Sequence, residues 1–198
     1  MKKRFTGILL GTLLGDANLE KKRIRINHSD KQKEYLFWKA KILEELTSVL
    51  VKPFQGKVNG KEYPMWRLYT KNHPYYERVG KQIIRNGHKE INSYLMKRLT
   101  PEGVAVWFLD DGYIDRNSAH LFTHSFSEAE NYLAKEWLLK KFGIKANVYK
   151  RRQYYYLRIN VESTEKIVNW VKALNIPSMM YKVSSYEKPS IKRGDEMV

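Results

Sequence analysis

The sequence contains no cysteine, which excludes disulfide bonds and thiolate zinc sites. It has no apolar run of the roughly 18–20 residues that a membrane-spanning helix needs, and no glycine- and serine-rich tract typical of a linker. Hydrophobic residues make up 42% of the chain and charged residues 29%, a composition typical of globular proteins. We therefore expect a folded, intracellular protein that is neither secreted nor bound to a membrane.

Acidic residues are scarce relative to basic ones. The chain has 37 Lys and Arg against 21 Asp and Glu, which gives a formal net charge of +16. Such an excess predicts a polyanionic partner, most often a nucleic acid; a basic surface that binds nothing is the alternative. Basic residues occur together with aromatic ones in three segments: 21–27 (KKRIRIN), 63–73 (YPMWRLYTKNH) and 148–160 (VYKRRQYYYLRIN).

These three segments alternate in the manner of β-strands. In the first, two isoleucines face one way and two arginines the other (Ile24 and Ile26; Arg23 and Arg25). In the last, a face with two tyrosines and an arginine opposes a more apolar one (Tyr154, Tyr156 and Arg158; Tyr155, Leu157 and Ile159). A sheet of this kind packs a core on one side and meets phosphates and bases with the other. Segments 29–46 and 127–142 are amphipathic and open with serine and acidic residues, which predicts helices.

An internal repeat decides how the first residues are interpreted. The opening MKKRFTGILLGTLLGDANLE has the outline of a secretory signal peptide, with a basic start, an apolar stretch and a small-residue end. However, LLGTLLGDANL (9–19) is echoed by VAVWFLDDGYI (104–114), and each is an apolar run that ends in an acidic and then a small residue. A signal peptide has no reason to be copied into the middle of a mature chain. We therefore predict two matched helices that place Asp16 and Asp111 at their ends.

Further landmarks follow the two motifs at similar distances. They are a His-Ser pair, a Tyr-Leu pair and a lysine in each half (His28 and His124; Tyr35 and Tyr132; Lys89 and Lys182). The repeat predicts two similar halves, residues 1–98 and 99–190, followed by a polar tail at 191–198.

Three glycines in the first motif indicate how the two helices pack. Gly7, Gly11 and Gly15 recur at every fourth position, on one face. Because each glycine costs about 1 kcal/mol in a helix interior relative to alanine, the stripe favours a close approach to a second helix. Val106 stands in the second motif where the first has Gly11, so less bare backbone is expected from the second helix.

Helices that cross side by side would bring Asp16 and Asp111 together. Two adjacent carboxylates repel each other, and a divalent cation between them removes that repulsion. Oxygen ligands suit Mg²⁺, which bridges to phosphate, and paired metals stabilise the attacking and leaving oxygens of a phosphodiester displacement. A basic sheet surface beside such a centre indicates a nuclease.

With both motifs in view, the sequence resembles the LAGLIDADG homing endonucleases of the single-chain, two-motif type that yeast mitochondrial introns encode. The resemblance runs from Phe5 to Lys182 and is most specific in 99–112 (LTPEGVAVWFLDDG) and 176–182 (IPSMMYK). It implies an α+β fold of two pseudo-twofold-related αββαββα halves, with the motif helices at the interface and two curved antiparallel sheets forming a DNA-binding saddle. It also implies a monomer that cuts both strands of double-stranded DNA at a long asymmetric site, leaving 3′ overhangs.

The resemblance further implies that Mg²⁺, with Mn²⁺ as a substitute, binds the acidic residue that ends each motif, with help from the carbonyl before it. Those positions are Asp16 and Asp111, with Gly15 and Asp110. A basic residue from each half would complete the catalytic set: Lys182 in the second half, and Lys89, or alternatively His88, in the first.

DNA contacts are predicted for basic and aromatic residues of the strand segments and for two histidines: Arg23, Arg25, His28, Arg67, Lys71, His124, Lys150, Arg151, Arg152, Tyr154, Tyr156 and Arg158. Several alternatives stay open. The two lysines could be ordinary surface residues, the two histidines could be general bases or structural, and the aromatic cluster 154–156 could be sheet packing. An intron RNA maturase and a non-catalytic DNA-binding regulator on the same scaffold are the alternative functions.

Overall fold

The computed structural model describes residues 3–187. The same order of helices and strands occurs twice along this chain. The first copy comprises α1 (Lys3–Leu14), β1 (Asn18–Glu20), β2 (Arg23–Ser29), α2 (Lys33–Leu43), β3 (Val49–Val58), β4 (Lys61–Thr70) and α3 (Pro74–Ile83). A two-stranded ribbon, β5 (Ile84–Arg85) and β6 (His88–Lys89), and α4 (Ser93–Arg98) lead to the second copy. That copy comprises α5 (Pro101–Asp111), β7 (Gly112–Asp115), β8 (Ser118–Leu121), α6 (Glu128–Phe142), β9 (Ala146–Arg151), β10 (Tyr154–Ile159) and α7 (Val161–Leu174), followed by a 3₁₀ segment, Pro177–Lys182.

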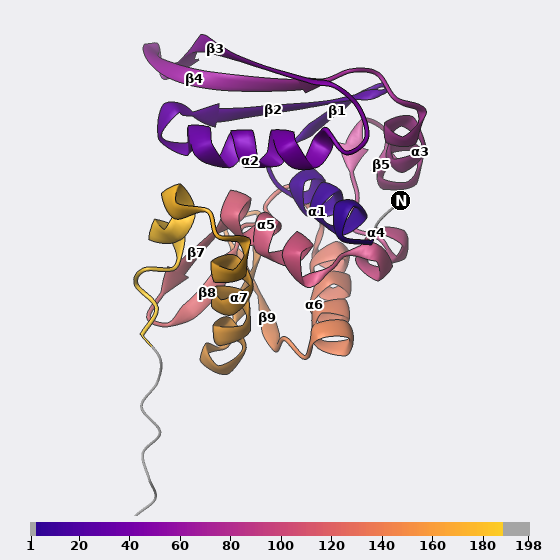
Figure 1. Ribbon diagram of the computed structural model, residues 1–198. Helices are drawn as coiled ribbons and strands as arrows, with labels where there is room; N and C mark the ends of the chain where they lie inside the picture. Colours follow the sequence, from indigo (N-terminus) through magenta and orange to yellow (C-terminus); the bar gives the residue numbers. More distant parts are fainter. Residues whose placement is uncertain (1–2, 188–198) are drawn as a thin grey trace, which may run out of the picture.

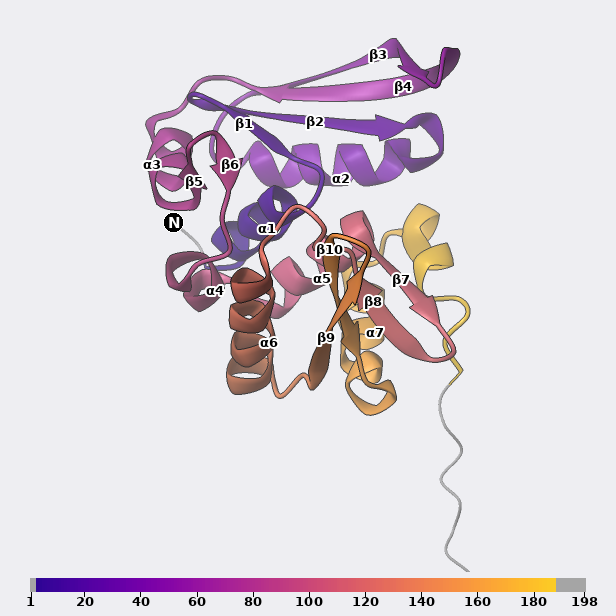
Figure 2. The same cartoon turned by 180° about the vertical axis from the view of Figure 1, so that it is seen from behind.

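Each half contains a four-stranded antiparallel sheet, and the predicted αββαββα order is confirmed. The strand orders are β1-β2-β4-β3 and β7-β8-β10-β9. Helices α1 and α5 pack against each other between the halves, with α2 against the first sheet and α6 and α7 against the second (Figure 1; Figure 2 from behind). No helix within residues 3–187 is long and apolar enough to cross a membrane. The tail predicted at 191–198 lies outside the described residues.

Local sequence explains where several elements begin. Ser127 and Glu130 form a reciprocal capping box at the start of α6, as the sequence predicts. By contrast, Ser29 makes no side-chain cap, and α2 begins only at Lys33, after a short 3₁₀ turn. Segment 148–160 is a hairpin rather than one strand, because Arg152 adopts a left-handed turn conformation (φ 57°) between β9 and β10.

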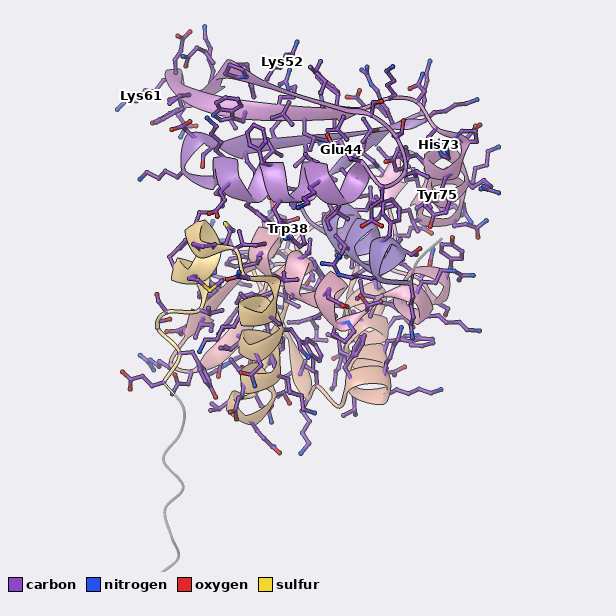
Figure 3. The ribbon with its side chains drawn as sticks, in the orientation of Figure 1. Trp38, Glu44, Lys52, Lys61, His73 and Tyr75 are labelled. Carbon is purple, nitrogen blue, oxygen red and sulfur yellow. The ribbon has the colours of Figure 1, made fainter. Side chains whose placement is uncertain are left out.

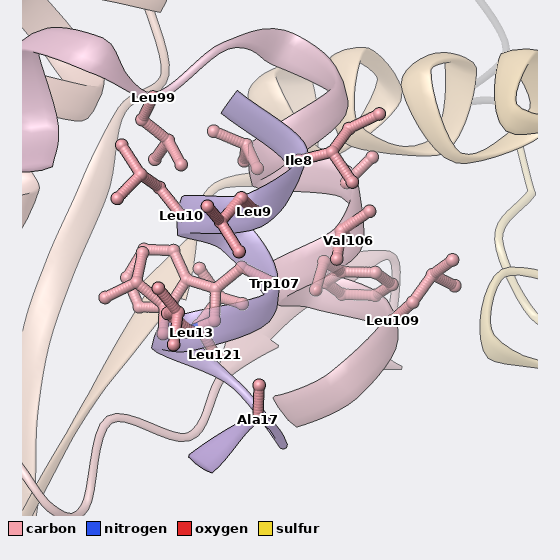
Figure 4. Packing of buried hydrophobic residues seen from close by; sticks show 14 of the residues in the cluster. Ile8, Leu9, Leu10, Leu13, Ala17, Leu99, Val106, Trp107, Leu109 and Leu121 are labelled. Atoms are coloured by element: carbon pink, nitrogen blue, oxygen red, sulfur yellow. The ribbon is translucent and has the colours of Figure 1, made fainter. Parts of the chain in front are cut away.

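Glycines set the crossing of α1 and α5, and buried hydrophobic residues such as Leu10, Leu13 and Trp107 pack around it (Figure 4). A Cβ on Gly11 would lie 2.0 Å from the Gly103 carbonyl oxygen, and one on Gly103 would lie 2.2 Å from the Gly7 carbonyl oxygen. The close approach predicted from the glycine stripe is confirmed. The second helix offers less bare backbone, as expected, because α5 contains one glycine, Gly103, whereas α1 contains Gly7 and Gly11.

Equivalent residues of the two halves are 95 positions apart in the sequence, from the motif helices α1 and α5 to the starts of α2 and α6. The left-handed turn residues Lys21 and Arg116 (φ 54° and 46°) have this offset, and α2 and α6 begin with it, at Lys33 and Glu128. The residue equivalent to His28 is therefore Thr123. The predicted pairing of His28 with His124 is wrong by one residue, and that of Tyr35 with Tyr132 is wrong by two.

Candidate active site

Asp16 and Asp111 lie at neighbouring ends of the crossed helices. Asp111 is the last residue of α5, and Asp16 follows α1 by two residues. Burial, together with the neighbouring Asp110 charge, raises the pKa of Asp16 to about 6. Burial and the charge of Asp16 raise the pKa of Asp111 to about 7. The structure thus brings the two predicted carboxylates into one electrostatic cluster.

Lys89 and Lys182 occupy equivalent places beside these carboxylates. The Lys89 ammonium donates to the carbonyl of Ala17 (3.2 Å), and Lys182 donates to that of Gly112 (2.9 Å). Ala17 and Gly112 are equivalent residues, each directly after its aspartate. Lys89 also donates to the Gly15 carbonyl at 2.9 Å. Burial lowers the pKa of both lysines, whereas the aspartate charges act to raise it.

The alternative residue His88 lies on β6 and is exposed. The geometry therefore favours Lys89 over His88 as the counterpart of Lys182.

The side chain of Asp110 belongs to a buried network with α2. Its two oxygens accept from the Lys39 ammonium at 2.7 and 2.9 Å, and both side chains are almost fully shielded from water. Lys39 also lies 3.2 Å from His28 Nε2, whose Nδ1 lies 3.1 Å from Gln32 Oε1. Burial, followed by the Lys39 charge, lowers the pKa of His28 to about 2. His28 is therefore neutral, accepting from Lys39 and donating to Gln32.

This network exists on one side of the pseudo-twofold axis. The positions equivalent to Asp110, His28 and Lys39 hold Gly15, Thr123 and Ala134. A Cβ on Gly15 would lie 2.4 Å from Asp110 Cβ, so the acidic side chain occupies the space that the glycine leaves. The Asp16 amide also donates to Asp110 Oδ2 at 3.3 Å.

Lys39 and Gln32 are the members of this network that the sequence does not predict, and for Lys39 a signal existed. The available signal was a lysine on the apolar face of the predicted helix 29–46, four residues after Tyr35 and four before Leu43, which are both buried.

The donors at this centre fit a divalent cation. Asp16, Asp110 and His28 each place one ligand atom within 4.8 Å of the others, but the Lys39 ammonium already neutralises Asp110 there. Burial and the neighbouring aspartate charges raise the pKa values of Asp16 and Asp111, and their carboxylate oxygens are the ligands that Mg²⁺ prefers. A cation is therefore best accommodated between these two residues.

The face of the first sheet that lies away from α2 is basic. We call it the first open face: Arg23, Arg25, Asn27, Lys52, Arg67 and Tyr69. Arg67 donates to Asn27 Oδ1 at 2.8 Å and lies over the Phe54 ring, 4.1 Å from its centroid. Arg23 lies over Tyr69 at 4.8 Å. Lys71 follows this face and, with Arg23 and Lys52, lines a shallow hollow.

The corresponding face of the second sheet is aromatic. We call it the second open face: Tyr113, His120, Phe122, Tyr149, Arg151, Tyr154, Tyr156 and Arg158. Its rings contact one another in series with centroid distances of 4.7–5.9 Å, and exposed His124 bridges Phe122 and Tyr154. The predicted DNA contacts Arg151, Tyr154, Tyr156 and Arg158 lie on this face, and Arg152 lies at the hairpin turn beside it.

Two predicted DNA contacts do not fit their positions. His28 is 2% exposed on the helix-covered side of the first sheet, with both ring nitrogens occupied. Lys150 pairs with Tyr155 in register and lies over its ring at 5.2 Å, on the face that carries Leu157 and packs against helices. Strand alternation puts it opposite Arg151.

Comparison with known proteins agrees with this geometry. Residues 6–167 match the model of the LAGLIDADG DNA endonuclease family. The chain is 25% identical over 198 residues to the cytochrome b mRNA maturase bI2 of Debaryomyces hansenii, covering 94% of this chain and 76% of that protein. It is 26% identical over 206 residues to the DNA endonuclease I-ChuI of Chlamydomonas applanata, covering 91% and 94%. Its fold is similar to that of the homing endonuclease I-WcaI bound to its DNA recognition sequence (TM-score 0.82, 23% identity, 92% of this chain and 86% of that one).

Proposed function

The chain belongs to the LAGLIDADG DNA endonuclease family, and from that premise we propose that it is a homing endonuclease that cuts both strands of double-stranded DNA. The observation that carries the proposal is the paired centre, in which Asp16 and Asp111 end two crossed helices and each has a lysine at an equivalent place. A binding module has no need of two partly buried carboxylates whose charges repel.

The chemistry follows from this pairing. Asp16 and Asp111, with the carbonyls of Gly15 and Asp110, would hold Mg²⁺ or Mn²⁺, which when bound supplies Lewis-acid stabilisation of the attacking and leaving oxygens. Lys89 and Lys182 are anchored to main-chain carbonyls, so each ammonium stays beside the centre and stabilises negative charge that develops on phosphate. Their lowered pKa values ease transfer of a proton. Cuts on the two strands would leave 3′ overhangs.

A long asymmetric target follows from the two open faces. One row of residues across the first sheet is polar and basic: Asn27, Arg67 and Lys52. The equivalent row of the second sheet is aromatic: Phe122, Tyr156 and Tyr149. Arginine and lysine read guanine and phosphate, whereas rings make apolar contacts such as those to thymine methyl groups. Because the two open faces differ so much in chemistry, they recognise two different half-site sequences rather than two copies of the same one.

The test separates cutting from binding. Asp16→Asn and Asp111→Asn each remove a metal-binding charge at nearly constant shape, so each should abolish double-strand cleavage in Mg²⁺ while DNA affinity changes little. Asp115→Asn, on the exposed end of β7, is the matched control and should cut normally. Wild-type cutting rates in either active-site variant would overturn the catalytic assignment.

Binding is tested on the open faces. Arg67→Ala should weaken DNA binding and reduce the slope of affinity against salt by about one unit for each phosphate that the protein no longer neutralises. Lys150→Ala, on the helix-covered face, should change neither the affinity nor the slope. Equal losses of affinity in both variants would place the DNA on a different surface.

Intron RNA binding by a maturase is the second candidate, favoured by the similarity to maturase bI2 over 94% of this chain. Splicing assistance that survives in the Asp16→Asn variant, together with absent DNA cleavage by the wild type, would support it.

A further inference from the structure

The two DNA-facing hairpins differ in length when they are aligned through the pseudo-twofold register. Arg25 pairs with Tyr69 in the first sheet, and His120 pairs with Arg158 in the second. Arg25 and His120 are equivalent because they are 95 residues apart, so Tyr69 and Arg158 are equivalent as well. Four residues earlier on each strand, Met65 corresponds to Tyr154, which is the first residue of β10.

The first hairpin continues past this point. Residues 55–58 of β3 pair with residues 61–64 of β4, and Asn59 and Gly60 close the turn with positive φ values of 49° and 78°. We call residues 55–64 the extension. The extension has four residue pairs, and at about 3.3 Å per residue these make the first hairpin roughly 13 Å longer than the second. In Figure 3, Lys61 marks the end of the hairpin and Lys52 lies further back along it.

The extension lacks support from the rest of the sheet. The pairing of β2 with β4 stops at Ser29 and Met65, so the extension is a two-stranded ribbon, which is marginal by itself in water. On the side that continues the first open face, the Met65 sulfur covers Gly56 and Tyr63 is 46% exposed. On the other side Lys57 and Glu62 form an exposed ion pair.

We propose, resting on the proposed function, that the first half reads a half-site about 3–4 base pairs longer than the second half does, and that the extension makes the outermost contacts. Base pairs stack about 3.4 Å apart, so the additional 13 Å of ribbon spans that number. Tyr63 and Lys61, which alternate onto the open-face side, are the side chains placed to reach these base pairs.

The test is a binding selection from duplexes with a randomised 30-base-pair core, in EDTA so that nothing is cut. The wild type is compared with a variant that lacks residues 55–58 and 61–64, which joins Phe54 and Met65 through Asn59-Gly60. Removing an even number from each strand keeps every remaining side chain on its face. The double variant Lys57→Ala, Glu62→Ala removes the ion pair on the other side of the ribbon at full length and serves as the control.

The deletion should shorten the selected sequence by 3–4 base pairs at one end only and leave the rest unchanged, while the double variant keeps the full length. Scrambling those outer pairs should weaken wild-type binding about tenfold and leave the deletion variant unaffected. An unchanged length after the deletion, or losses at both ends, would overturn the inference. If the wild type selects no sequence at all, the proposed function itself fails.

Discussion

Lys39 and Asp110 form an ion pair whose side chains are 1% and 0% exposed. Both side chains make further contacts besides the ion pair. Lys39 also contacts His28 and lies over the Tyr35 ring at 4.2 Å, and Asp110 accepts a hydrogen bond from the Asp16 amide. Removing one partner of such a pair leaves a buried charge without compensation. The network therefore fixes the backbone at Asp16 and also makes the centre sensitive to substitution.

Lys39→Met should accordingly lower the free energy of unfolding by about 3–5 kcal/mol, measured by urea denaturation. The double variant Lys39→Met, Asp110→Asn should be less destabilised than the two single changes together. Lys81→Met, which removes an exposed helical pair with Glu77, is the matched control and should cost less than about 1 kcal/mol. Equal losses in the free energy of unfolding at Lys39 and Lys81 would show that the buried ion pair stabilises the fold no more than the exposed one.

The two active-site aspartates should make metal-free stability depend on pH. Their folded pKa values of about 6 and 7 lie above the ordinary value of 3.8, so between about pH 4 and pH 7 the folded state binds more protons than the unfolded state. The free energy of unfolding therefore falls as pH rises through that range. Relative to wild type, Asp111→Asn should flatten the decline of the melting temperature between pH 5 and pH 7.5.

The same substitution should raise the metal-free melting temperature at pH 7.5, although it abolishes cutting. Added Mg²⁺ should stabilise the wild type at that pH and have little effect on the variant. Asp115→Asn should leave the pH dependence as it is. A wild-type pH dependence in the Asp111→Asn variant would mean that burial and the neighbouring charges do not raise the pKa of Asp111 in the folded state.

At the scale of elements, the crossing of α1 and α5 depends on bare backbone. Gly11→Ala would place a methyl group 2.0 Å from the Gly103 carbonyl oxygen, a contact that only movement of a main chain relieves. We expect a loss of about 3 kcal/mol or more in the free energy of unfolding, at the upper end of overpacking effects. Gly80→Ala in α3 meets only the end of the Leu19 side chain and should be close to neutral, because alanine also favours the helix.

The elements themselves could be predicted because each has a local cause. Alternation gave the faces of β2 and β10, the serine-glutamate box gave the start of α6, and the repeated apolar runs gave α1 and α5. The offset between the halves could not be read in the same way. The His-Ser and Tyr-Leu pairs match as letters, but the turn residues and the helix starts place Thr123 at the position equivalent to His28.

The residues of the candidate site also divide into those that the sequence predicts and those that it does not. Asp16 and Asp111 could be selected because each ends a repeated apolar run, and Lys89 and Lys182 because they lie at similar distances after the motifs and match the family resemblance. The ion pair of Asp110 with Lys39 could not, because it joins residues 71 positions apart across the interface. The sequence predicts DNA contacts for both Lys150 and Arg151, whereas strand alternation puts these two residues on opposite faces of β9.

At the scale of the whole molecule, the two halves share a fold and diverge at their surfaces. The pseudo-twofold axis relates α1 to α5 and Lys89 to Lys182, although the glycines at the helix crossing do not occupy equivalent positions. It is broken by the Asp110 network, by the chemistry of the open faces and by the extension. A single chain is free to diverge in this way because each half is encoded separately, whereas a symmetric dimer would carry every change twice.

That arrangement predicts a functional monomer. Both aspartates and both sheets reside in one chain, and the α1–α5 contact already fills the place of a subunit interface. The free protein should sediment near its 23.6 kDa mass and bind DNA one to one. Mixing the Asp16→Asn and Asp111→Asn variants offers a sharper test: each lacks one carboxylate of the same centre, so the mixture should stay inactive. Cutting restored by mixing, or a cutting rate that rises with the square of protein concentration, would show that two chains assemble the centre.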